Sequence, residues 1–272
     1  MFELVLSKTN FMRKRLLSIL AIALVLIVQA QQVDLNKLFK TMKPRNIGPA
    51  GMSGRVTAID AVYNNPTTIY LGTASGGVWK TENGGASWIP MFDEQPILNI
   101  GSIAITQSNP SVVWAGTGEG NPRNSVSLGE GMYKSLDGGK TWKCMGLQKT
   151  RNIHRILIDP KNPDIVYAGV MGNPFIEHAE RGVYKTTDGG KTWQLVLKVN
   201  DDTGATDIAI DPESPGILYA AMYQRRRTVF GFNGSGEGSA LYKTNDGGAN
   251  WKKITTGMPY DTENAPTPRP AD

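Results

Sequence analysis

Cysteine and histidine are scarce in this chain of 272 residues, which contains one cysteine and two histidines. Cys144 has no second cysteine with which to pair, so no disulfide can form within the chain. So few cysteines and histidines cannot build an ordinary zinc site without carboxylates. We therefore expect no metal and no other cofactor.

Long apolar runs are also scarce, and the one that stands out is short. Residues 16–28 are mainly apolar and follow Arg13, Lys14 and Arg15. This run of 13 residues is shorter than the about 20 that a membrane helix needs. With the small-residue signal that ends at Ala30, it predicts a signal peptide over residues 1–30, cleaved after Ala30. We expect export to the periplasm, the cell surface or the medium, with membrane contact only during export. A membrane anchor is the alternative interpretation.

A strong excess of one charge is missing once this segment is set aside. Lys8, Arg13, Lys14 and Arg15 lie in it with Glu3, and the remaining residues carry 25 basic and 23 acidic side chains. A nucleic-acid-binding domain is usually far more basic than this. We therefore expect no nucleic-acid partner.

What the chain does contain is a nine-residue phrase written four times. The copies read KTENGGASW at 80–88, KSLDGGKTW at 134–142, KTTDGGKTW at 185–193 and KTNDGGANW at 243–251. Their tryptophans are 54, 51 and 58 residues apart. A repeat of about 50 residues is typical of a propeller blade or of a solenoid unit.

Each phrase closes a longer unit that predicts four strands. Two apolar runs joined by a proline turn are followed by a third run that enters the phrase, and a fourth run follows the tryptophan, as in WQLVLKV at 193–199. Short apolar runs between turn residues indicate strands, and no helical period is sustained. We predict an all-β fold, a β-propeller of four-stranded antiparallel blades. The expected ranges are 44–94, 95–147, 148–199 and 200–258 for the blades, 31–43 for a lead-in, and 259–272 for a Pro-rich tail or linker.

The phrase is predicted to stabilise the turn between the third and fourth strands. Its glycines permit the positive φ of a tight turn, and the residue before them can accept hydrogen bonds from its own turn. A calcium loop is the alternative, but it needs several oxygen ligands and each phrase usually offers one carboxylate. The turn residues are Asn83, Asp137, Asp188 and Asp246, and the tryptophans expected to pack between blades are Trp88, Trp142, Trp193 and Trp251.

The four phrases resemble Asp boxes, also called BNR repeats. Such boxes mark the propellers of sialidases, xyloglucan-type endoglucanases, sortilin and Vps10 receptors, and a photosystem assembly factor. The runs NIGPAGMSGRV at 46–56 and TIYLGTASGGVWKTENGGASW at 68–88 resemble the start of large exported bacterial proteins labelled sortilin-like or glycosyl hydrolase. The resemblance covers residues 44–258 and implies a propeller. It implies function less specifically, because the box is the part that serves the fold.

Because the strands are antiparallel, the loops that connect them lie on two opposite faces. The longest loops are all expected on one of these faces. The long loops are 118–131, 171–182 and 223–239. Binding residues concentrate on loops that a rigid scaffold holds, so we predict that this long-loop face binds the ligand. A solvated polar rim is the alternative. The candidate binding residues are Arg55, Arg123, His154, Arg155, Asp207, Arg225, Arg226, Arg227, Phe230 and Phe232.

Two classes of function are compatible with such a face. A glycoside hydrolase needs two carboxylates about 5–9.5 Å apart, and the sequence singles out no pair. The resemblance to xyloglucan-type enzymes implies a catalytic Asp in Thr-Asp-x-Gly-Gly, where this chain has Ala74 in Thr73-Ala74-Ser75-Gly76-Gly77. The Arg-Ile-Pro start of sialidases is also missing. The weak catalytic candidates are Glu119, Glu130, Glu177, Glu180, Asp207 and Glu237.

We therefore predict an interaction module that binds a protein, a peptide or a polysaccharide. The alternative is a glycoside hydrolase whose carboxylates are degenerate here or lie beyond this chain. Related propellers usually close with more than four blades, so we expect these blades to be the front of a longer propeller. Assembly with a second copy and closure as a compact ring are the other two possibilities.

Overall fold

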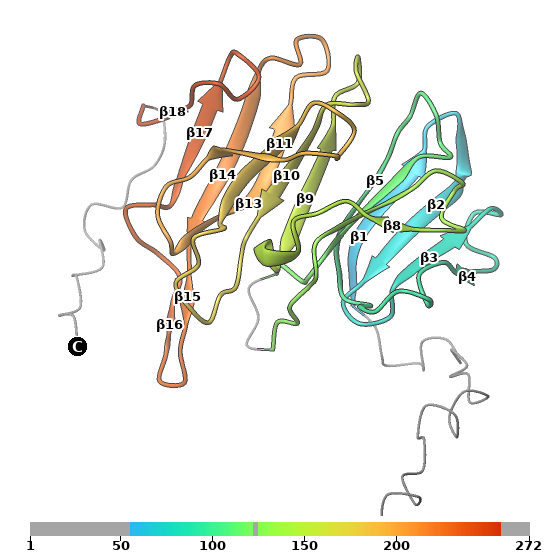
Figure 1. Ribbon diagram of the computed structural model, residues 1–272, viewed down its shortest axis with the longest axis horizontal. Coiled ribbons are helices and arrows are strands. Elements are labelled where there is room, and N and C mark those ends of the chain that lie inside the picture. The colour runs from blue at the N-terminus through green and yellow to red at the C-terminus, as the bar shows by residue number, and fades with distance from the viewer. Residues whose placement is uncertain (1–54, 122–124, 257–272) are drawn as a thin grey trace, which may run out of the picture. The chain divides into compact units, whose positions relative to one another are not determined.

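The computed structural model describes residues 55–121 and 125–256, all within one compact unit that spans Asn46–Asp272. The predicted signal peptide, lead-in and tail lie outside the described residues, as does the candidate Arg123. Apart from one short 3-10 turn, the regular secondary structure of the described part is all β-strand (Figure 1).

Four antiparallel sheets follow one another along the chain, which confirms the predicted propeller blades. Blade 1 contains β1 (Val56–Val62), β2 (Asn65–Thr73), β3 (Val78–Thr81) and β4 (Ile89–Pro90). Blade 2 contains β5 (Ile100–Ile105), β6 (Val113–Thr117), β7 (Met132–Ser135) and β8 (Lys143–Cys144).

The last two blades have the same plan with one addition. Blade 3 contains β9 (Ile153–Ile158), β10 (Val166–Val170), β11 (Gly182–Thr186) and β12 (Gln194–Leu197), and a 3-10 turn, η1 (Gln148–Thr150), precedes it. Blade 4 contains β13 (Thr203–Ile210), β14 (Leu218–Gln224), β17 (Ala240–Thr244) and β18 (Lys252–Lys253). A hairpin of β15 (Arg226–Arg227) and β16 (Phe232–Asn233) is inserted between β14 and β17. The fourth strands begin just after the box tryptophans, and in blades 1, 2 and 4 they are only two residues long.

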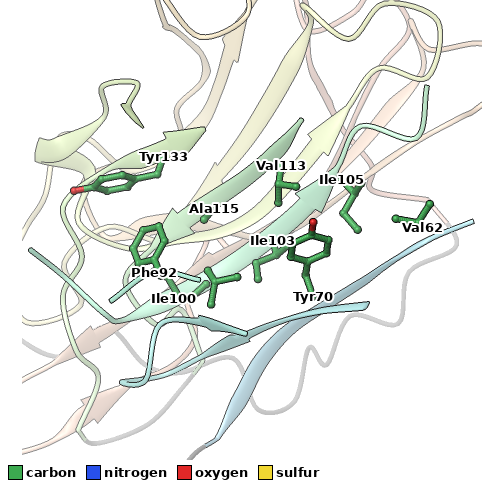
Figure 2. Close-up of a cluster of buried hydrophobic side chains, with 10 residues drawn as sticks. Val62, Tyr70, Phe92, Ile100, Ile103, Ile105, Val113, Ala115 and Tyr133 are labelled. Atoms are coloured by element: carbon green, nitrogen blue, oxygen red, sulfur yellow. The ribbon is translucent and has the colours of Figure 1, made fainter. Parts of the chain in front are cut away.

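The apolar core lies between consecutive blades, in three clusters. Figure 2 shows the cluster between blades 1 and 2, where Tyr70 of β2 faces Ile103 and Ile105 of β5. Phe92, from the link between the two blades, meets Tyr133 of β7 edge to face, with 5.2 Å between the ring centroids. Because each sheet buries a face against its neighbour, the blades depend on one another for stability.

The Asp box forms the turn between the third and fourth strands in every blade, as predicted. Asp188 accepts hydrogen bonds from the Thr186 hydroxyl (2.7 Å), the Thr192 amide (2.9 Å) and the Thr192 hydroxyl (2.6 Å). Gly189 and Gly190 follow with φ of 69° and 94°, a conformation that favours glycine. The aspartate therefore closes its own turn through hydrogen bonds.

Trp142, Trp193 and Trp251 pack against the clusters between blades, as predicted, whereas Trp88 of the first box is half-buried and belongs to none of these clusters. Two of the three also tie consecutive blades together by hydrogen bonds. The indole N–H groups of Trp142 and Trp193 donate to the carbonyls of Met91 and Met145, each at 2.7 Å. Each carbonyl belongs to the link that leaves the preceding blade. The box thus stabilises both a turn and a joint between blades.

The hydrogen-bonded box aspartates make the stability of the fold depend on pH. Hydrogen bonds from Thr141 hold the pKa of Asp137 at about 2, those from Thr244 and Asn250 hold the pKa of Asp246 at about 2, and those from Thr192 keep the pKa of Asp188 below its usual range. An unfolded Asp titrates near about 3.9. These carboxylates therefore stabilise the fold above about pH 4, and that contribution is lost as the pH falls toward about 2.

We expect the melting temperature to fall steeply between about pH 4 and pH 2. The matched variant is Asp188→Asn, because Asn83 already occupies the corresponding place in the first box and closes its turn by the same amide contact. Asn does not titrate, so the acid-dependent loss should shrink in the variant. Thermal melts followed by circular dichroism across this pH range would test the prediction. If the melting temperature of the variant fell with pH as steeply as that of the unaltered protein, the assignment would be contradicted.

Candidate binding face

The three long loops meet on one face of the blades, together with the links between blades. The amide of Gly129 donates to the Arg151 carbonyl (3.0 Å), that of His178 to the Asp201 carbonyl (2.9 Å), and that of Arg227 to the Pro174 carbonyl (2.8 Å). Each of these bonds joins a long loop to a link or to another long loop. The proline turns and the Asp boxes lie at the opposite ends of the strands (Figure 1).

Arg181 holds this face together from inside. Its side chain is fully buried, and its guanidinium donates to four backbone carbonyls. Desolvation lowers the pKa of Arg181 to about 10. Because the four acceptors come from the loop 171–182, the link before β13 and the start of the hairpin, one side chain fixes three segments. The acceptors are Asn173, Ile176, Asp202 and Arg225.

Arg55 and Glu119 form a two-pronged ion pair between blades 1 and 2. The Nε and Nη2 atoms of Arg55 lie 2.9 and 2.6 Å from the two carboxylate oxygens. The Glu119 side chain is fully buried, whereas 40% of the Arg55 side chain is exposed. Asn152 donates to the backbone carbonyl of Glu119. Both oxygens of this catalytic candidate are therefore occupied by a structural contact, while Arg55 faces solvent.

A second polar group joins blades 3 and 4. Arg155 and Asp207 form an exposed ion pair with 3.2 Å between the nearest atoms. His154 packs so closely on Gly120 that a Cβ there would lie 2.3 Å from the ring. Burial lowers the pKa of His154, and its Nδ1 is buried with no protein partner among the described residues. A neutral His154 is thus the resting form at neutral pH.

The β15–β16 hairpin projects from this face and carries its most exposed apolar side chains. Val229 and Phe230 are 96% and 98% exposed, and Phe232 is 43% exposed. We call these three residues the hairpin patch. Phe175 and Ile176 are also exposed, and they follow Pro174, whose carbonyl anchors the base of the hairpin. Exposed aromatic side chains of this kind are unusual on a solvated surface.

The remaining carboxylate candidates lie at different points of the face. Glu180 accepts a hydrogen bond from the Tyr184 hydroxyl (2.8 Å), and Glu130 and Glu237 are exposed. Glu177 and Asp202 both contact Nη2 of Arg226, at 3.2 and 2.7 Å, so their nearest oxygens are within about 6 Å of each other. A depression of the surface is lined by Glu177, Asn200, Asp201, Asp202 and Gln224.

Some predicted site residues are corrected by these contacts. Arg225 is buried rather than exposed, and its guanidinium lies beneath the Phe232 ring (5.7 Å) and contacts the Asn121 carbonyl (3.3 Å). It supports the loops and does not face a ligand. Arg226 is half-buried in ion pairs, and Arg227 is half-buried. Arg181 and Asp202 were not among the candidates, because a polar residue in a loop carries no signal of burial.

No helix in the ranges 55–121 and 125–256 is long and apolar enough to cross a bilayer. The same ranges hold no group of three or more metal-ligating side chains suited to an ion.

Comparisons with known proteins give two kinds of likeness. The Sortilin-Vps10 family profile, described as "Sortilin, neurotensin receptor 3", matches residues 130–260. The xyloglucanase Xgh74A of Acetivibrio thermocellus is 25% identical over 244 residues, covering 79% of this chain and 27% of that protein. A probable oligoxyloglucan-reducing end-specific xyloglucanase of Neosartorya fischeri is 24% identical over 218 residues, covering 74% of this chain and 24% of that protein. The chain thus spans about a quarter of the length of these relatives.

Solved structures resemble the fold in the same way. An ancestral GH74 enzyme matches with a TM-score of 0.59 at 24% identity, over 75% of this chain and 26% of that one. The GH74 enzyme of Niastella koreensis matches with a TM-score of 0.53 at 20% identity, over 78% and 31% of the two chains. The chain is therefore an Asp-box β-propeller protein that is similar to the sortilin-Vps10 proteins over residues 130–260 and to xyloglucanases over most of its length.

Proposed function

We propose that the long-loop face binds an extended polysaccharide of the xyloglucan class, as an interaction surface without a catalytic centre in these four blades. The observation that carries the proposal is the exposed patch on a hairpin whose base, through Arg226, contacts the lining of a polar depression. Aromatic rings bury a large apolar face at little entropic cost. Neighbouring amide and carboxylate groups, such as Asn200 and Gln224, can accept and donate hydrogen bonds to hydroxyls. Sugars present both apolar ring faces and hydroxyl groups, so they match both features.

The choice of polysaccharide over peptide rests on the sequence neighbours. The relatives described above are named as xyloglucanases, and each aligns with about three quarters of this chain. A binding surface can persist where catalysis is absent, because function resides in the site and not in the fold. We also infer that the protein acts outside the cytoplasm, since residues 1–30 predict a signal peptide.

Two positions speak against a catalytic centre in these four blades. Ala74 stands where the resemblance places a catalytic acid, and it is buried in a turn in which Thr73 accepts from the Gly76 amide and donates to the Gly77 carbonyl. Glu119, the most enclosed carboxylate among the candidates, is occupied by Arg55. Neither position can present a free carboxyl group to a substrate.

A glycoside hydrolase is the second candidate, and one observation favours it. Glu177 and Asp202 lie on one rim, and both contact Arg226, so two carboxylates are near each other as a glycosidase requires. Both are held by Arg226, however, so neither carboxylate faces a substrate free of a protein partner. Release of reducing ends from xyloglucan, abolished by Glu177→Gln, would establish this candidate instead.

We expect the double variant Phe230→Ala/Phe232→Ala to weaken binding to xyloglucan roughly tenfold, which corresponds to about 1.4 kcal/mol. Two aromatic faces would no longer be buried against the sugar rings. Affinity electrophoresis in gels that contain xyloglucan, or calorimetry with its oligosaccharides, would measure the change. Starch and mannan serve as comparison polymers.

The matched control is Leu136→Ala. Leu136 is 68% exposed and lies in an Asp-box turn on the opposite face, so its removal deletes exposed apolar surface away from the proposed site. Equal losses in both variants, or no binding by the unaltered protein, would contradict the proposal. If the protein bound a peptide and no polysaccharide, the ligand class would be peptide and not polysaccharide.

A further inference from the structure

The chain contains five places where an asparagine or an aspartate directly precedes a glycine. Glycine has no Cβ to shield its backbone nitrogen, so this nitrogen can attack the side-chain carbonyl carbon of the residue before it. Asparagine is among the thermolabile residues of proteins for this reason. Four of the five places lie in the Asp boxes, and the fifth joins Asn233 to Gly234 in the inserted hairpin.

The four places in the Asp boxes are held by one repeated contact. In each box, the amide of the first glycine donates to a backbone carbonyl in or next to the turn between the first two strands of the same blade. A nitrogen whose proton is engaged in this way cannot attack until the hydrogen bond breaks. The donor and acceptor residues are Gly84 and Thr67 (3.0 Å), Gly138 and Ser111 (2.8 Å), Gly189 and Asp164 (3.0 Å), and Gly247 and Gly216 (2.8 Å).

The bond between Asn233 and Gly234 lacks this contact. Asn233 is exposed and ends β16, in the hairpin that projects from the blades (Figure 1). Among the described residues, no carbonyl accepts a hydrogen bond from the Gly234 amide. The Ser235 amide instead donates to Oδ1 of Asn233 (3.2 Å), which folds the side chain back over its own turn. A donor at this oxygen also stabilises the negative charge that develops there during attack on the carbonyl carbon.

We propose that Asn233 is a site of spontaneous deamidation. The Gly234 nitrogen loses its proton and bonds to the side-chain carbonyl carbon of Asn233. The bond from that carbon to the side-chain nitrogen breaks, and ammonia leaves with the proton. Water then opens the resulting five-membered succinimide ring at one of its two carbonyls. One opening gives aspartate, and the other gives isoaspartate, in which the backbone runs through the former side-chain carbon.

The modification acts on the hairpin through Arg226. Asn233 and Arg226 are direct partners between β16 and β15, so their side chains lie on the same face of the hairpin. Arg226 contacts Glu177 (3.2 Å) and Asp202 (2.7 Å). A carboxylate at position 233 would compete with both, and isoaspartate would lengthen the backbone and disrupt the pairing of the two strands. If the hairpin binds a polysaccharide, as the proposed function requires, deamidation would weaken that binding.

Ageing of the full chain tests the proposal. The protein is kept in mildly alkaline and in mildly acidic buffer, and its peptides are then analysed by mass spectrometry. We expect the peptide with Asn233 to gain one mass unit and to separate into two products. This gain should be roughly tenfold faster than at Asn83, because Gly84 must first break a hydrogen bond. It should also be faster in the alkaline buffer, because the attacking nitrogen must lose its proton.

Two controls separate the fold from the local sequence. Asn233→Gln keeps the amide group, but its longer side chain closes a ring far less readily, so this variant should gain no mass at position 233. In protein unfolded by urea, the contact that protects Asn83 is absent, so Asn83 and Asn233 should be modified at similar rates. Similar rates in the folded protein, or no mass gain at Asn233, would overturn the proposal.

The consequence for the hairpin has a readout that is independent of any ligand. The Thr228 amide donates to the Gly231 carbonyl (2.9 Å) at the tip of the hairpin, and its hydrogen exchange should be faster in the aged protein. Unchanged exchange would contradict the effect on the hairpin. Asn233→Asp, which is one of the two products, should bind xyloglucan more weakly than the unaltered protein. A mass gain at Asn233 in a protein that binds no polysaccharide would overturn the proposed function and leave the deamidation site standing.

Discussion

Replacement of Arg181 by methionine is expected to lower the free energy of unfolding by roughly 3–5 kcal/mol and to loosen the long-loop face. Methionine fills much of the same volume but donates no hydrogen bonds. The four carbonyls that Arg181 satisfies would then be left without their donor, one of them buried and three part-buried. Buried acceptors without partners are among the costliest defects in a folded protein.

Urea unfolding would measure the loss, and hydrogen exchange would locate it. We expect faster exchange at the amides of His178, Arg225 and Arg227, which connect the segments that Arg181 holds. Arg181→Lys should recover only part of the stability, because an ammonium cannot match the fixed fork of a guanidinium. The matched control is Arg227→Met, the same change at a half-buried position. An equal loss in both variants would show that Arg181 has no special role.

Replacement of Trp114 by alanine should remove roughly 3–5 kcal/mol of stability. Trp114 is fully buried between blades 2 and 3, meets Trp193 edge to face at 6.2 Å, and lies under the Lys134 ammonium. Its loss would empty the centre of a joint and leave Lys134 without its ring. Since each apolar cluster joins only two consecutive blades, the two halves of the chain could then unfold in separate steps.

Calorimetry would distinguish a single transition from two. Trp88→Ala is the control, because Trp88 has the same size but is only half-buried in the first box. Trp114→Phe should cost much less than Trp114→Ala, since it keeps an aromatic ring in the joint and removes an indole N–H that has no partner among the described residues. A loss for Trp114→Ala no larger than that of the control would contradict the central place of this side chain.

The fold was largely predictable because its determinants are local. Each Asp box contains the residues that stabilise its own turn. Asp188, for example, closes its turn through Thr186 and Thr192, all within seven residues. Alternating apolar runs and proline turns define the first two strands, and the repeat multiplies the signal four times. Trp142, Trp193 and Trp251 were also correctly expected between blades, since an aromatic after a tight turn has few other places to pack. Trp88, in the first box, belongs to none of these clusters. The short fourth strands were less visible, because two residues carry no period.

The candidate site was predictable only as a face. Strand order alone places the loops 118–131, 171–182 and 223–239 on one side, and the structure confirms it. The roles within that face were not predictable, because burial decides them. Glu119 and Arg225 look like surface charges in the sequence, yet one is enclosed by an ion pair and the other lies beneath Phe232.

The sequence by itself determined the repeated blade, its turns and the side on which the long loops lie, because those features depend on neighbours along the chain. The tertiary structure decided which charged groups are buried and how Arg181 fixes three segments. Those outcomes depend on contacts between residues far apart in the chain. The Arg55 and Glu119 pair, 64 residues apart, shows the reason: no local pattern records which charge a folded neighbour will neutralise.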